Sequence, residues 1–382
     1  MASNLSSAIH ILGAGPSGAL TALALAQLGH SVDLVDPKSV DELKARSRAY
    51  ALTHSSRRLL EKLSLWTELL PTLVPFQELD LSDAAVDRSV LFSLQDLDPS
   101  SQSHGAIGWI LDHRPLMEAL LERLRASEGV HLHLGTTPPQ PHNDSLVIAA
   151  DGPGSPARQA WGIKTWSHRY KQGCLTAKVV LRGIDSGKAY ELFRPEGPLA
   201  VLPLADGCFQ VVWSAPMDRC LDRAALAKSA FLDQLAGVLP EGIEPDLLLD
   251  QPAAFPQQLM LARRLSSGRG VLVGEAAHRC HPVGGQGLNL CWRDVETLAA
   301  LAQQPHSARR KARRYARKRL LDVAFVSLAT DLLVRLFSNR QPILLPVRSM
   351  ALMLLHKLPL SRRLSLRAMT NGPLRILSPL PD

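Results

Sequence analysis

The chain has 382 residues, of which 46% are hydrophobic and 20% charged, and its net charge is +8. This composition is typical of a soluble globular protein with room for one large core or two domains. Uninterrupted apolar runs of about 18 residues are absent, so we expect no membrane-spanning helix. The first residues lack the basic region of a signal peptide. Five scattered cysteines without a Cys-x-x-Cys pair favour free thiols and a cytoplasmic location.

Basic residues are concentrated toward the C-terminus. Residues 306–382 hold 16 Lys and Arg against three Asp and Glu, a local charge of +13, so the rest of the chain carries −5. Such asymmetry favours a nucleic acid or an anionic membrane surface as partner. Because neither a nucleic-acid-binding motif nor interleaved aromatic residues occur, we expect no nucleic-acid partner.

A dinucleotide-binding unit is predicted at the N-terminus. Residues 8–12 read as a strand, 19–28 as a helix and 31–35 as a second strand, which ends in Asp36. The first turn reads Gly13-Ala-Gly15-Pro-Ser-Gly18. In such units the glycines make the turn, admit a pyrophosphate and let helix pack on strand, while the acid binds a ribose hydroxyl. A GxGxxG alone is weak evidence, but strands, helix and acid together predict dinucleotide binding.

Residues 46–170 continue the α/β pattern. Arg46 and Arg48 either meet cofactor phosphates or lie in a solvated basic loop. Further predicted elements are a helical region to about residue 70, strands at 106–111 and 130–134, a helix at 115–124 and a turn in the Pro-rich segment 137–144. A strand at 145–150 ends in Asp151-Gly152-Pro-Gly154-Ser-Pro-Ala-Arg158. Ligand contacts gather at such strand ends, although a plain Asp-Gly turn is also common.

A second architecture follows. Strand-like runs at 177–181, 189–193, 199–203 and 209–213 predict an antiparallel sheet. A helix is predicted over 221–239 and a strand over 253–261. Toward the C-terminus, residues 309–337 and 342–358 read as helices that combine apolar faces with arginines. Such helices either bind an anionic lipid surface or pack on the protein's own body, and both interpretations stay open.

The most informative stretch spans residues 269–298. It reads as a strand from Val271 to Val273, then Gly274-Glu275, Pro282, Gly284-Gly285-Gln286-Gly287 and a helix from Leu288. Glycines admit a ligand close to the backbone, and a helix N-terminus presents N–H groups and the positive end of a dipole. The stretch suits a large anionic or electron-accepting ligand, the alternative being an ordinary strand–turn–helix. His278 and His281 lack a third ligand, so we expect no metal site.

Three separated motifs together resemble a known family. They are the GxGxxG with Asp36, the segment 151–158, and Gly274-Glu275-Ala-Ala-His278 running into His281-Pro282-Val-Gly-Gly-Gln-Gly-Leu-Asn289. They resemble the single-component flavoprotein aromatic hydroxylases (group A flavoprotein monooxygenases), and among these the quinone-biosynthesis branch. Further matches to that branch are Arg48-Ala-Tyr-Ala-Leu52, Tyr170-Lys-Gln172, Phe193 with Gly197-Pro-Leu-Ala-Val-Leu-Pro203, and Thr330-Asp331 through Leu336-Phe-Ser-Asn339.

The resemblance implies an α/β fold. It combines a Rossmann-like FAD-binding domain of the GR2, p-hydroxybenzoate hydroxylase-like type with an inserted antiparallel β-sheet substrate domain and a C-terminal helical segment. The predicted ranges are 1–75, 104–170 and 262–305 for the FAD-binding domain, 76–103 and 171–261 for the substrate domain, and 306–382 for the basic helical segment.

The resemblance also implies FAD as cofactor and NAD(P)H as co-substrate, the latter bound without its own dinucleotide domain. The implied FAD contacts begin with Gly13, Gly15 and Gly18 at the pyrophosphate, Asp36 at the ribose and Arg48 near the phosphates. Asp151, Gly152 and Arg158 lie in a segment shared with the nicotinamide pyrophosphate, and Gly274 and Glu275 at the ribityl chain. Gly285, Gln286 and Gly287 are further cofactor-binding residues, and Leu288 and Asn289 lie at the flavin ring. The amides of Leu288 and Asn289 face the ring's developing negative charge, which a helix N-terminus stabilises. Pro282 is placed beside the reactive C4a carbon, and no protein acid or base is assigned.

Two residues depart from the family pattern. Glu275 stands where the family usually has Asp, so the ribityl contact must shift or pass through water. Cys291 replaces a glycine and is small enough to pack. Neither change removes a chemically required group.

The resulting prediction is an FAD-dependent monooxygenase that uses NAD(P)H and O2 to hydroxylate a polyprenyl phenol or benzoate in ubiquinone or plastoquinone-type biosynthesis. The predicted substrate-lining residues are Tyr190, Phe193, Leu202, Pro203 and Trp213. Their spacing along the strands is equally typical of side chains in the core of the sheet.

The predicted partners are this hydrophobic substrate, an anionic membrane surface that binds residues 306–382 and a quinone-biosynthesis complex. The alternatives are another flavin-dependent oxidoreductase, a halogenase or isoprenoid reductase, and a non-catalytic member of such a complex. A halogenase's Trp-x-Trp-x-Ile-Pro segment is absent.

Overall fold

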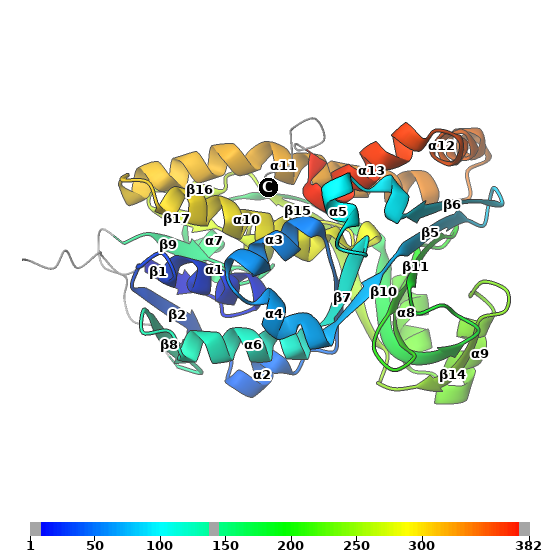
Figure 1. Ribbon diagram of the computed structural model, residues 1–382, viewed down its shortest axis with the longest axis horizontal. Helices are drawn as coiled ribbons and strands as arrows, with labels where there is room; N and C mark the ends of the chain where they lie inside the picture. Colours follow the sequence, from blue (N-terminus) through cyan, green and yellow to red (C-terminus); the bar gives the residue numbers. More distant parts are fainter. Residues whose placement is uncertain (1–8, 137–144, 374–382) are drawn as a thin grey trace, which may run out of the picture.

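The computed structural model describes residues 9–136 and 145–373. Three β-sheets form its framework, and helices from both halves of the chain cover them (Figure 1). The predicted turn at 137–144, the chain's first eight residues and the end of the basic segment after residue 373 lie outside the described residues.

The first sheet is the predicted dinucleotide-binding sheet. Its strand order is β16-β17-β9-β1-β2-β8, and every neighbouring pair except β16–β17 is parallel. Its strands are β1 (Ile9–Leu12), β2 (Val32–Asp36), β8 (Val130–Leu134), β9 (Val147–Ala149), β16 (Ser266–Ser267) and β17 (Gly270–Leu272). The strands that begin at residues 9 and 270 thus belong to one sheet. The first and the last of the three cofactor motifs therefore lie close together.

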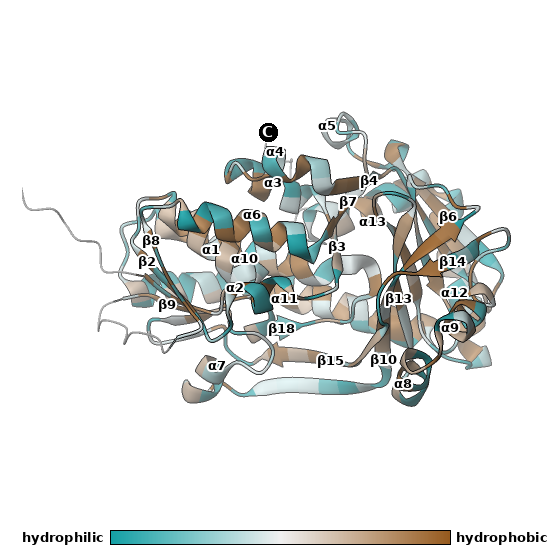
Figure 2. Ribbon diagram, turned by 90° about the horizontal axis from the view of Figure 1, so that it is seen from below, coloured by the Kyte–Doolittle hydropathy of each residue, from teal (hydrophilic) through white to brown (hydrophobic). Residues whose placement is uncertain are grey.

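Helix α1 (Pro16–Ala26) is the central helix of this half. It packs between the sheet, α6 (His113–Arg125) and α10 (Gln286–Ala302). Because α1 is covered on several sides, its Ala and Leu residues are buried all round, as expected for an interior helix. Helix α6 lies farther out and carries both hydrophobic and hydrophilic residues along its length (Figure 2).

The second sheet is larger than the sequence predicts. Its order is β18-β15-β10-β13-β12-β11-β5-β6, with β14 added beside β10. Its strands are β5 (Glu78–Asp83), β6 (Arg88–Ser93), β10 (Thr165–Arg182), β11 (Lys188–Phe193), β12 (Leu199–Pro203), β13 (Cys208–Pro216), β14 (Glu244–Leu248), β15 (Ala253–Ala262) and β18 (His278–Arg279). The predicted antiparallel arrangement holds for most pairs, but β11 and β5 pair in parallel. This exception arises because β5 enters the sheet from a distant part of the chain.

The helix predicted over 221–239 is two helices. Helix α8 (Met217–Ala224) packs on β10, whereas α9 (Lys228–Ala236) packs on β14. The backbone is extended at Ala227, so the second helix starts in a new direction. The break lets one apolar segment cover two different strands.

A small third sheet and short helices connect the two larger sheets. The sheet is formed by β3 (Ala49–Leu52), β7 (Gly108–Asp112) and β4 (Leu73–Phe76), all antiparallel. The other elements in this part of the chain are α2 (Val40–Lys44), α3 (His54–Lys62), α4 (Trp66–Leu69), η1 (Leu70–Thr72), η2 (Leu94–Asp96), α5 (Pro99–Gln102), α7 (Pro156–Ala160), η3 (Gly274–Ala276) and η4 (Val283–Gly285).

The C-terminal segment is helical, as predicted. It comprises α11 (Ala308–Phe337), η5 (Pro342–Leu344), α12 (Leu345–Lys357) and α13 (Pro359–Asn371). Helix α11 runs along the first sheet's side of the molecule, and α12 stands over β6 (Figure 1). A fully buried ion pair joins Arg348 of α12 to Asp83 of β5, with Nε 2.6 Å from Oδ2.

Within the described residues, no single helix has the length and apolar character to cross a bilayer. The pair formed by 342–357 and 359–371 satisfies those criteria only in combination, and it bends by 99°.

Candidate functional site

Four predicted cofactor positions lie at one edge of the first sheet. Gly13 follows β1, Asp36 ends β2, Asp151 follows β9 and Gly274 follows β17 shortly after its end. These strands are parallel neighbours in the order β17-β9-β1-β2, so their carboxyl ends meet at the same edge. Open α/β sheets bind ligands at this edge.

The three glycines of the first motif have separate roles. A Cβ on Gly13 (φ +99°) would lie 2.4 Å from the Ala150 carbonyl oxygen, and one on Gly18 would lie 1.8 Å from the Gly13 oxygen. These two glycines therefore allow the close packing of β1, β9 and α1. Gly15 has no heavy atom within 4 Å of its Cβ position, and no side chain caps α1. The open Gly15 and the uncapped helix N-terminus fit an anionic pyrophosphate.

Asp36 stabilises the glycine-rich turn of the predicted dinucleotide-binding unit. Its Oδ2 accepts the Ala14 N–H at 2.7 Å and its Oδ1 accepts the Lys38 N–H at 2.9 Å. Each carboxylate oxygen keeps a further lone pair for another donor. The contact with a ribose hydroxyl stays a prediction.

The 151–158 segment is tied to the Gly274 turn. Asp151 accepts the Ser155 hydroxyl at 2.5 Å and the Ala157 N–H at 3.0 Å, and so supports the first turn of α7, whose N-cap is Ser155. Arg158 is buried and donates from Nη1 to the Ala276 oxygen at 2.8 Å. Both side chains are thus engaged within the protein, while Gly152 (φ +86°) has open space at its Cβ position. Contacts of Asp151, Gly152 and Arg158 with a cofactor stay predictions.

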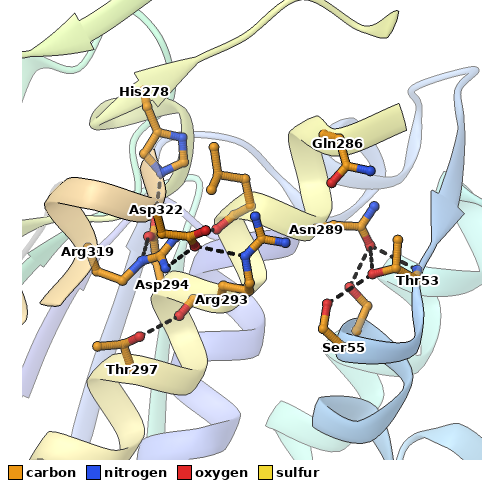
Figure 3. Close-up of polar contacts among 12 residues, drawn as sticks. Thr53, Ser55, His278, Gln286, Asn289, Arg293, Asp294, Thr297, Arg319 and Asp322 are labelled. Carbon is orange, nitrogen blue, oxygen red and sulfur yellow. Dashed lines mark hydrogen bonds and ion pairs between the residues drawn. The ribbon is translucent and has the colours of Figure 1, made fainter. Parts of the chain in front are cut away.

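A buried ionic network that includes His278, Asp294 and Arg319 (Figure 3) is hydrogen-bonded to the Gly274 turn. The Asp294 Oδ2 accepts the Gly274 N–H at 2.9 Å and lies 2.8 Å from His278 Nε2, and its Oδ1 accepts Arg319 Nε at 2.6 Å. Burial alone would raise the pKa of Asp294, but its interactions with His278 and Arg319 and the Gly274 hydrogen bond lower it to about 2. Asp322 on α11 accepts from both Arg319 and Arg293. The network fixes α10, α11 and the turn relative to one another.

Asn289 fixes the start of α10. Its Oδ1 accepts the Thr53 N–H at 3.1 Å and the Ser56 hydroxyl at 2.6 Å, and its Nδ2 donates to the Ala51 oxygen at 2.8 Å. The N-cap residue Gly285 has a φ of +62°, and no side chain caps the helix. The N–H groups of the first residues of α10, Gln286 to Leu288, therefore lack a side-chain cap, and the contacts of Leu288 and Asn289 with a flavin stay predictions.

An apolar cavity extends from this helix start. The predicted cofactor residues that border it are Arg48, Glu275, Pro282, Gly285, Gln286, Gly287 and Leu288. The described residues give the Glu275 carboxylate no hydrogen bond or ion pair, which leaves it available to a ligand. Gly287 has open space at its Cβ position. Uncapped helix starts, open glycines and a free acid together fit a dinucleotide cofactor that carries an electron-accepting ring.

Cys291 packs behind the Gly274 turn. A Cβ placed on Gly274 (φ +64°) would lie 3.4 Å from the Cys291 sulfur and 3.1 Å from the Ser17 hydroxyl. Burial raises the pKa of the Cys291 thiol well above its usual value. The thiol therefore stays protonated and fills space.

Two further motifs meet beside Pro282. The Tyr170 hydroxyl donates to Asp331 Oδ1 at 2.7 Å, and the Tyr170 ring lies edge-on to His281, with centroids 5.3 Å apart. Burial lowers the pKa of His281 to about 3, so this imidazole is neutral. The loop that carries Pro282 is thereby held against α11.

One face of the second sheet lines the other side of the cavity. Phe193 and Leu202 border it, and Phe193 stacks on Phe337 of α11 with centroids 4.4 Å apart. Tyr190 borders the cavity but packs mainly with the core on the opposite face. The structure does not bring Pro203 or Trp213 to the cavity. Trp213 points to the opposite face because strand side chains alternate, and it donates there to Glu196 at 3.2 Å.

Two features of the site are not predicted from the sequence. One is the Asp294 network, whose members are far apart in sequence. The other is Glu191, a buried acid on the cavity face of β11. Strand alternation offered a signal for Glu191, because it lies two residues before Phe193 and so shares its face.

The comparisons with known proteins agree with this geometry. Residues 143–321 match the model of an FAD binding domain. The chain is 29% identical over 357 residues to ubiquinone hydroxylase UbiL of Rhodospirillum rubrum, covering 86% of this chain and 81% of that protein. It is 27% identical over 386 residues to 3-demethoxyubiquinol 3-hydroxylase of Escherichia coli, covering 94% and 97%. The FAD binding domain and the similarity to these hydroxylases confirm the prediction of an FAD-dependent aromatic hydroxylase.

Solved structures of other proteins share its fold. HpxO of Klebsiella pneumoniae, complexed with FAD and uric acid, superposes with a TM-score of 0.73 at 19% identity, over 96% of this chain and 97% of that one. The oxygenase of 2-methyl-3-hydroxypyridine-5-carboxylic acid gives a TM-score of 0.74 at 18% identity, over 97% and 98%. The predicted p-hydroxybenzoate hydroxylase-like fold and the FAD cofactor are confirmed. The exact domain boundaries and the single cofactor contacts stay predictions.

Proposed function

We propose that this FAD-dependent monooxygenase hydroxylates the aromatic ring of a polyprenyl phenol or benzoate in quinone biosynthesis. The observation that carries the proposal is the course of the cavity. It begins at Pro282 and the start of α10 and extends to Leu333 on α11 and to Leu366 and Met369 on α13. An aromatic ring beside the flavin therefore has a continuous apolar path for a long isoprenoid tail. Relatives named for ubiquinone hydroxylation support the same substrate class.

The residues of the chain hold and orient the reactants. Bound FAD supplies electron transfer from NAD(P)H, the usual reductant of the family, and activation of O2 for insertion of one oxygen atom into the ring. The α10 N-terminus would stabilise negative charge on a bound flavin ring, and Glu275 would hold its ribityl chain. Phe193 and Leu202 cover the ring site with apolar surface and exclude water.

A profile of quinone precursors tests this function. Cells that lack the protein should accumulate one prenylated aromatic intermediate that is missing a ring hydroxyl. Its structure identifies the ring position and separates a ubiquinone from a plastoquinone pathway. Unchanged quinones and precursors in such cells would contradict the proposal.

We also propose that α11, α12 and α13 dock on an anionic membrane surface. Of the 19 large apolar side chains that are exposed in the described part of the chain, 13 lie between Leu320 and Leu364. Exposed cations surround them, among them Arg313, Arg317 and Arg363. Basic amphipathic surfaces bind anionic lipid, and the cavity reaches these same helices.

Vesicle binding tests the docking surface. The holoenzyme should sediment with vesicles that contain phosphatidylglycerol but not with phosphatidylcholine alone. The double variant Phe325→Ser/Leu328→Ser should lose binding, whereas Leu247→Ser on β14 should retain it. The result against membrane docking is a protein that binds neither kind of vesicle and has the mass of a dimer or larger complex in solution. If the double variant abolishes that complex, the surface forms protein contacts instead.

The other functions are less well supported. A flavin-dependent halogenase, CmlS, shares the fold at 17% identity, which is evidence for the fold alone. Formation of a C–O bond with NAD(P)H consumption separates a hydroxylase from a halogenase or an isoprenoid reductase. A non-catalytic role predicts FAD that stays oxidised in the presence of NAD(P)H and every prenylated phenol or benzoate.

A further inference from the structure

The cavity holds one acid that the cofactor motifs do not explain. Glu191 lies on β11, and strand alternation places it on the cavity face with Ala189 and Phe193. Across the sheet it pairs with Ala200, which pairs with Val212, which pairs with Thr176. These three partners are uncharged, so Glu191 is the only charged group in this row of the sheet.

The two oxygens of Glu191 differ in their surroundings. Oε2 accepts the N–H of Gly284 at 3.2 Å, which joins the sheet to the loop between Pro282 and the start of α10. Within residues 9–136 and 145–373, Oε1 has no hydrogen-bond partner and Glu191 forms no ion pair. The side chain is 9% exposed and borders the cavity. One oxygen is therefore fixed by the protein and the other is left to a ligand.

Burial controls the charge of this acid. Desolvation raises the pKa of Glu191 to about 7, against a smaller opposite effect of the Gly284 hydrogen bond. The other titratable and charged groups that border the cavity are Arg48, Tyr50, Cys174, Tyr190, Glu275, His278, Arg279, Cys280 and Cys291. An acid–base group is most effective when its pKa lies near the working pH.

We propose that Oε1 of Glu191 accepts the hydrogen bond of the substrate's ring hydroxyl and takes its proton during hydroxylation. This inference rests on the proposed function and narrows it to rings that carry a hydroxyl, because only they have such a proton; a carboxylate next to that hydroxyl, close to Glu191, would be repelled. The O–H bond breaks and its electron pair stays on oxygen, which enriches the ring positions ortho and para to it. Once the new C–O bond has formed, the displaced ring proton leaves to water and Glu191 returns its proton to the first oxygen.

The test uses the FAD-loaded enzyme, NAD(P)H, and 2-prenylphenol as probe, with the methyl ether of that phenol for comparison. In the wild type, kcat for hydroxylated product should rise with pH as Glu191 loses its proton. Glu191→Gln should lower kcat by about 100-fold or more and abolish this rise, since general acid–base catalysis contributes about 10²–10⁴-fold. FAD content should not change, because Gln still accepts the Gly284 N–H. Glu191→Asp should restore the pH-dependent rise, and the exposed control Glu241→Gln should behave like the wild type.

Two measurements keep the test decisive if Glu191→Gln folds poorly. The methyl ether has no proton to donate, so the wild-type enzyme should show no Glu191-dependent rise with it. Infrared spectra of the wild type should show a carboxylic acid carbonyl band that is lost near neutral pH.

The outcomes separate this inference from the proposed function. If the wild type hydroxylates 2-prenylphenol while Glu191→Gln keeps its kcat and pH profile, Glu191 has no proton-transfer role, and the proposed function stands. If the FAD-loaded wild type hydroxylates 4-hydroxy-3-prenylbenzoate but not 2-prenylphenol, the comparison is made on the benzoate, and an unchanged kcat and pH profile of Glu191→Gln there overturns the role of Glu191. If it hydroxylates neither probe, both the function and this inference fail.

Discussion

Replacement of Asp294 by Asn tests whether the ionic network stabilises the Gly274 turn. The side chain is fully buried and accepts from Gly274, His278 and Arg319. Asn keeps the size of the side chain but loses its charge. A change of one pKa unit corresponds to about 1.4 kcal/mol. Lowering the pKa of Asp294 from 3.8 to about 2 therefore contributes roughly 2.5 kcal/mol to the free energy of unfolding. We expect Asp294→Asn to lose about this much stability at neutral pH, and Asp294→Ala to lose about 3–5 kcal/mol because Arg319 loses a buried partner.

The sign of the pH dependence follows from the lowered pKa. The stabilisation by Asp294 is complete above the unfolded-state pKa near 4 and is lost as the pH falls toward 2. Urea unfolding of the apoprotein, followed by tryptophan fluorescence, should therefore show a smaller gap between wild type and Asp294→Asn at pH 3 than at pH 7. The exposed Asp233→Asn on α9 is the matched control. The reasoning is refuted if Asp294→Asn and Asp233→Asn have the same urea midpoint at pH 7.

Three further changes have defined outcomes. Because burial raises the pKa of Glu191 to about 7, the free energy of unfolding of the wild type should fall by about 3 kcal/mol between pH 4.5 and 7. Glu191→Gln should not show this loss. If the melting temperatures of both proteins change equally across this range, burial does not raise the pKa of Glu191. Arg348→Met leaves Asp83 as a buried unpaired charge, so unfolding should cost about 3–5 kcal/mol less and hydrogen exchange in α12 should accelerate; unchanged exchange there would contradict the pairing. Gly13→Ala places a Cβ 2.4 Å from a carbonyl oxygen at a φ of +99°, so the purified variant should lack the yellow FAD spectrum, and normal flavin content would show that the turn can relax.

The sequence by itself determined the cofactor motifs and the type of most elements. The GxGxxG turn, the Gly274-Glu275 run and the helix after Gly287 are local patterns, in which glycine conformation and apolar periodicity act over a few residues. The same local signals predicted the helical C-terminal segment and the parallel first sheet.

Only the tertiary structure decided which distant groups meet. Gly284 and Glu191 lie 93 residues apart, and Asp294 reaches Gly274 and Arg319 across 20 and 25 residues. Strand register determines the pairing of β11 with β5 and the face of the sheet on which Trp213 lies. A register shift of one residue would move every side chain of a strand to the opposite face of the sheet. Register is set by the packing of the whole sheet. The cofactor motifs were therefore recognisable from local patterns, whereas the position of Glu191 beside Gly284 on the cavity lining was decided by long-range pairing.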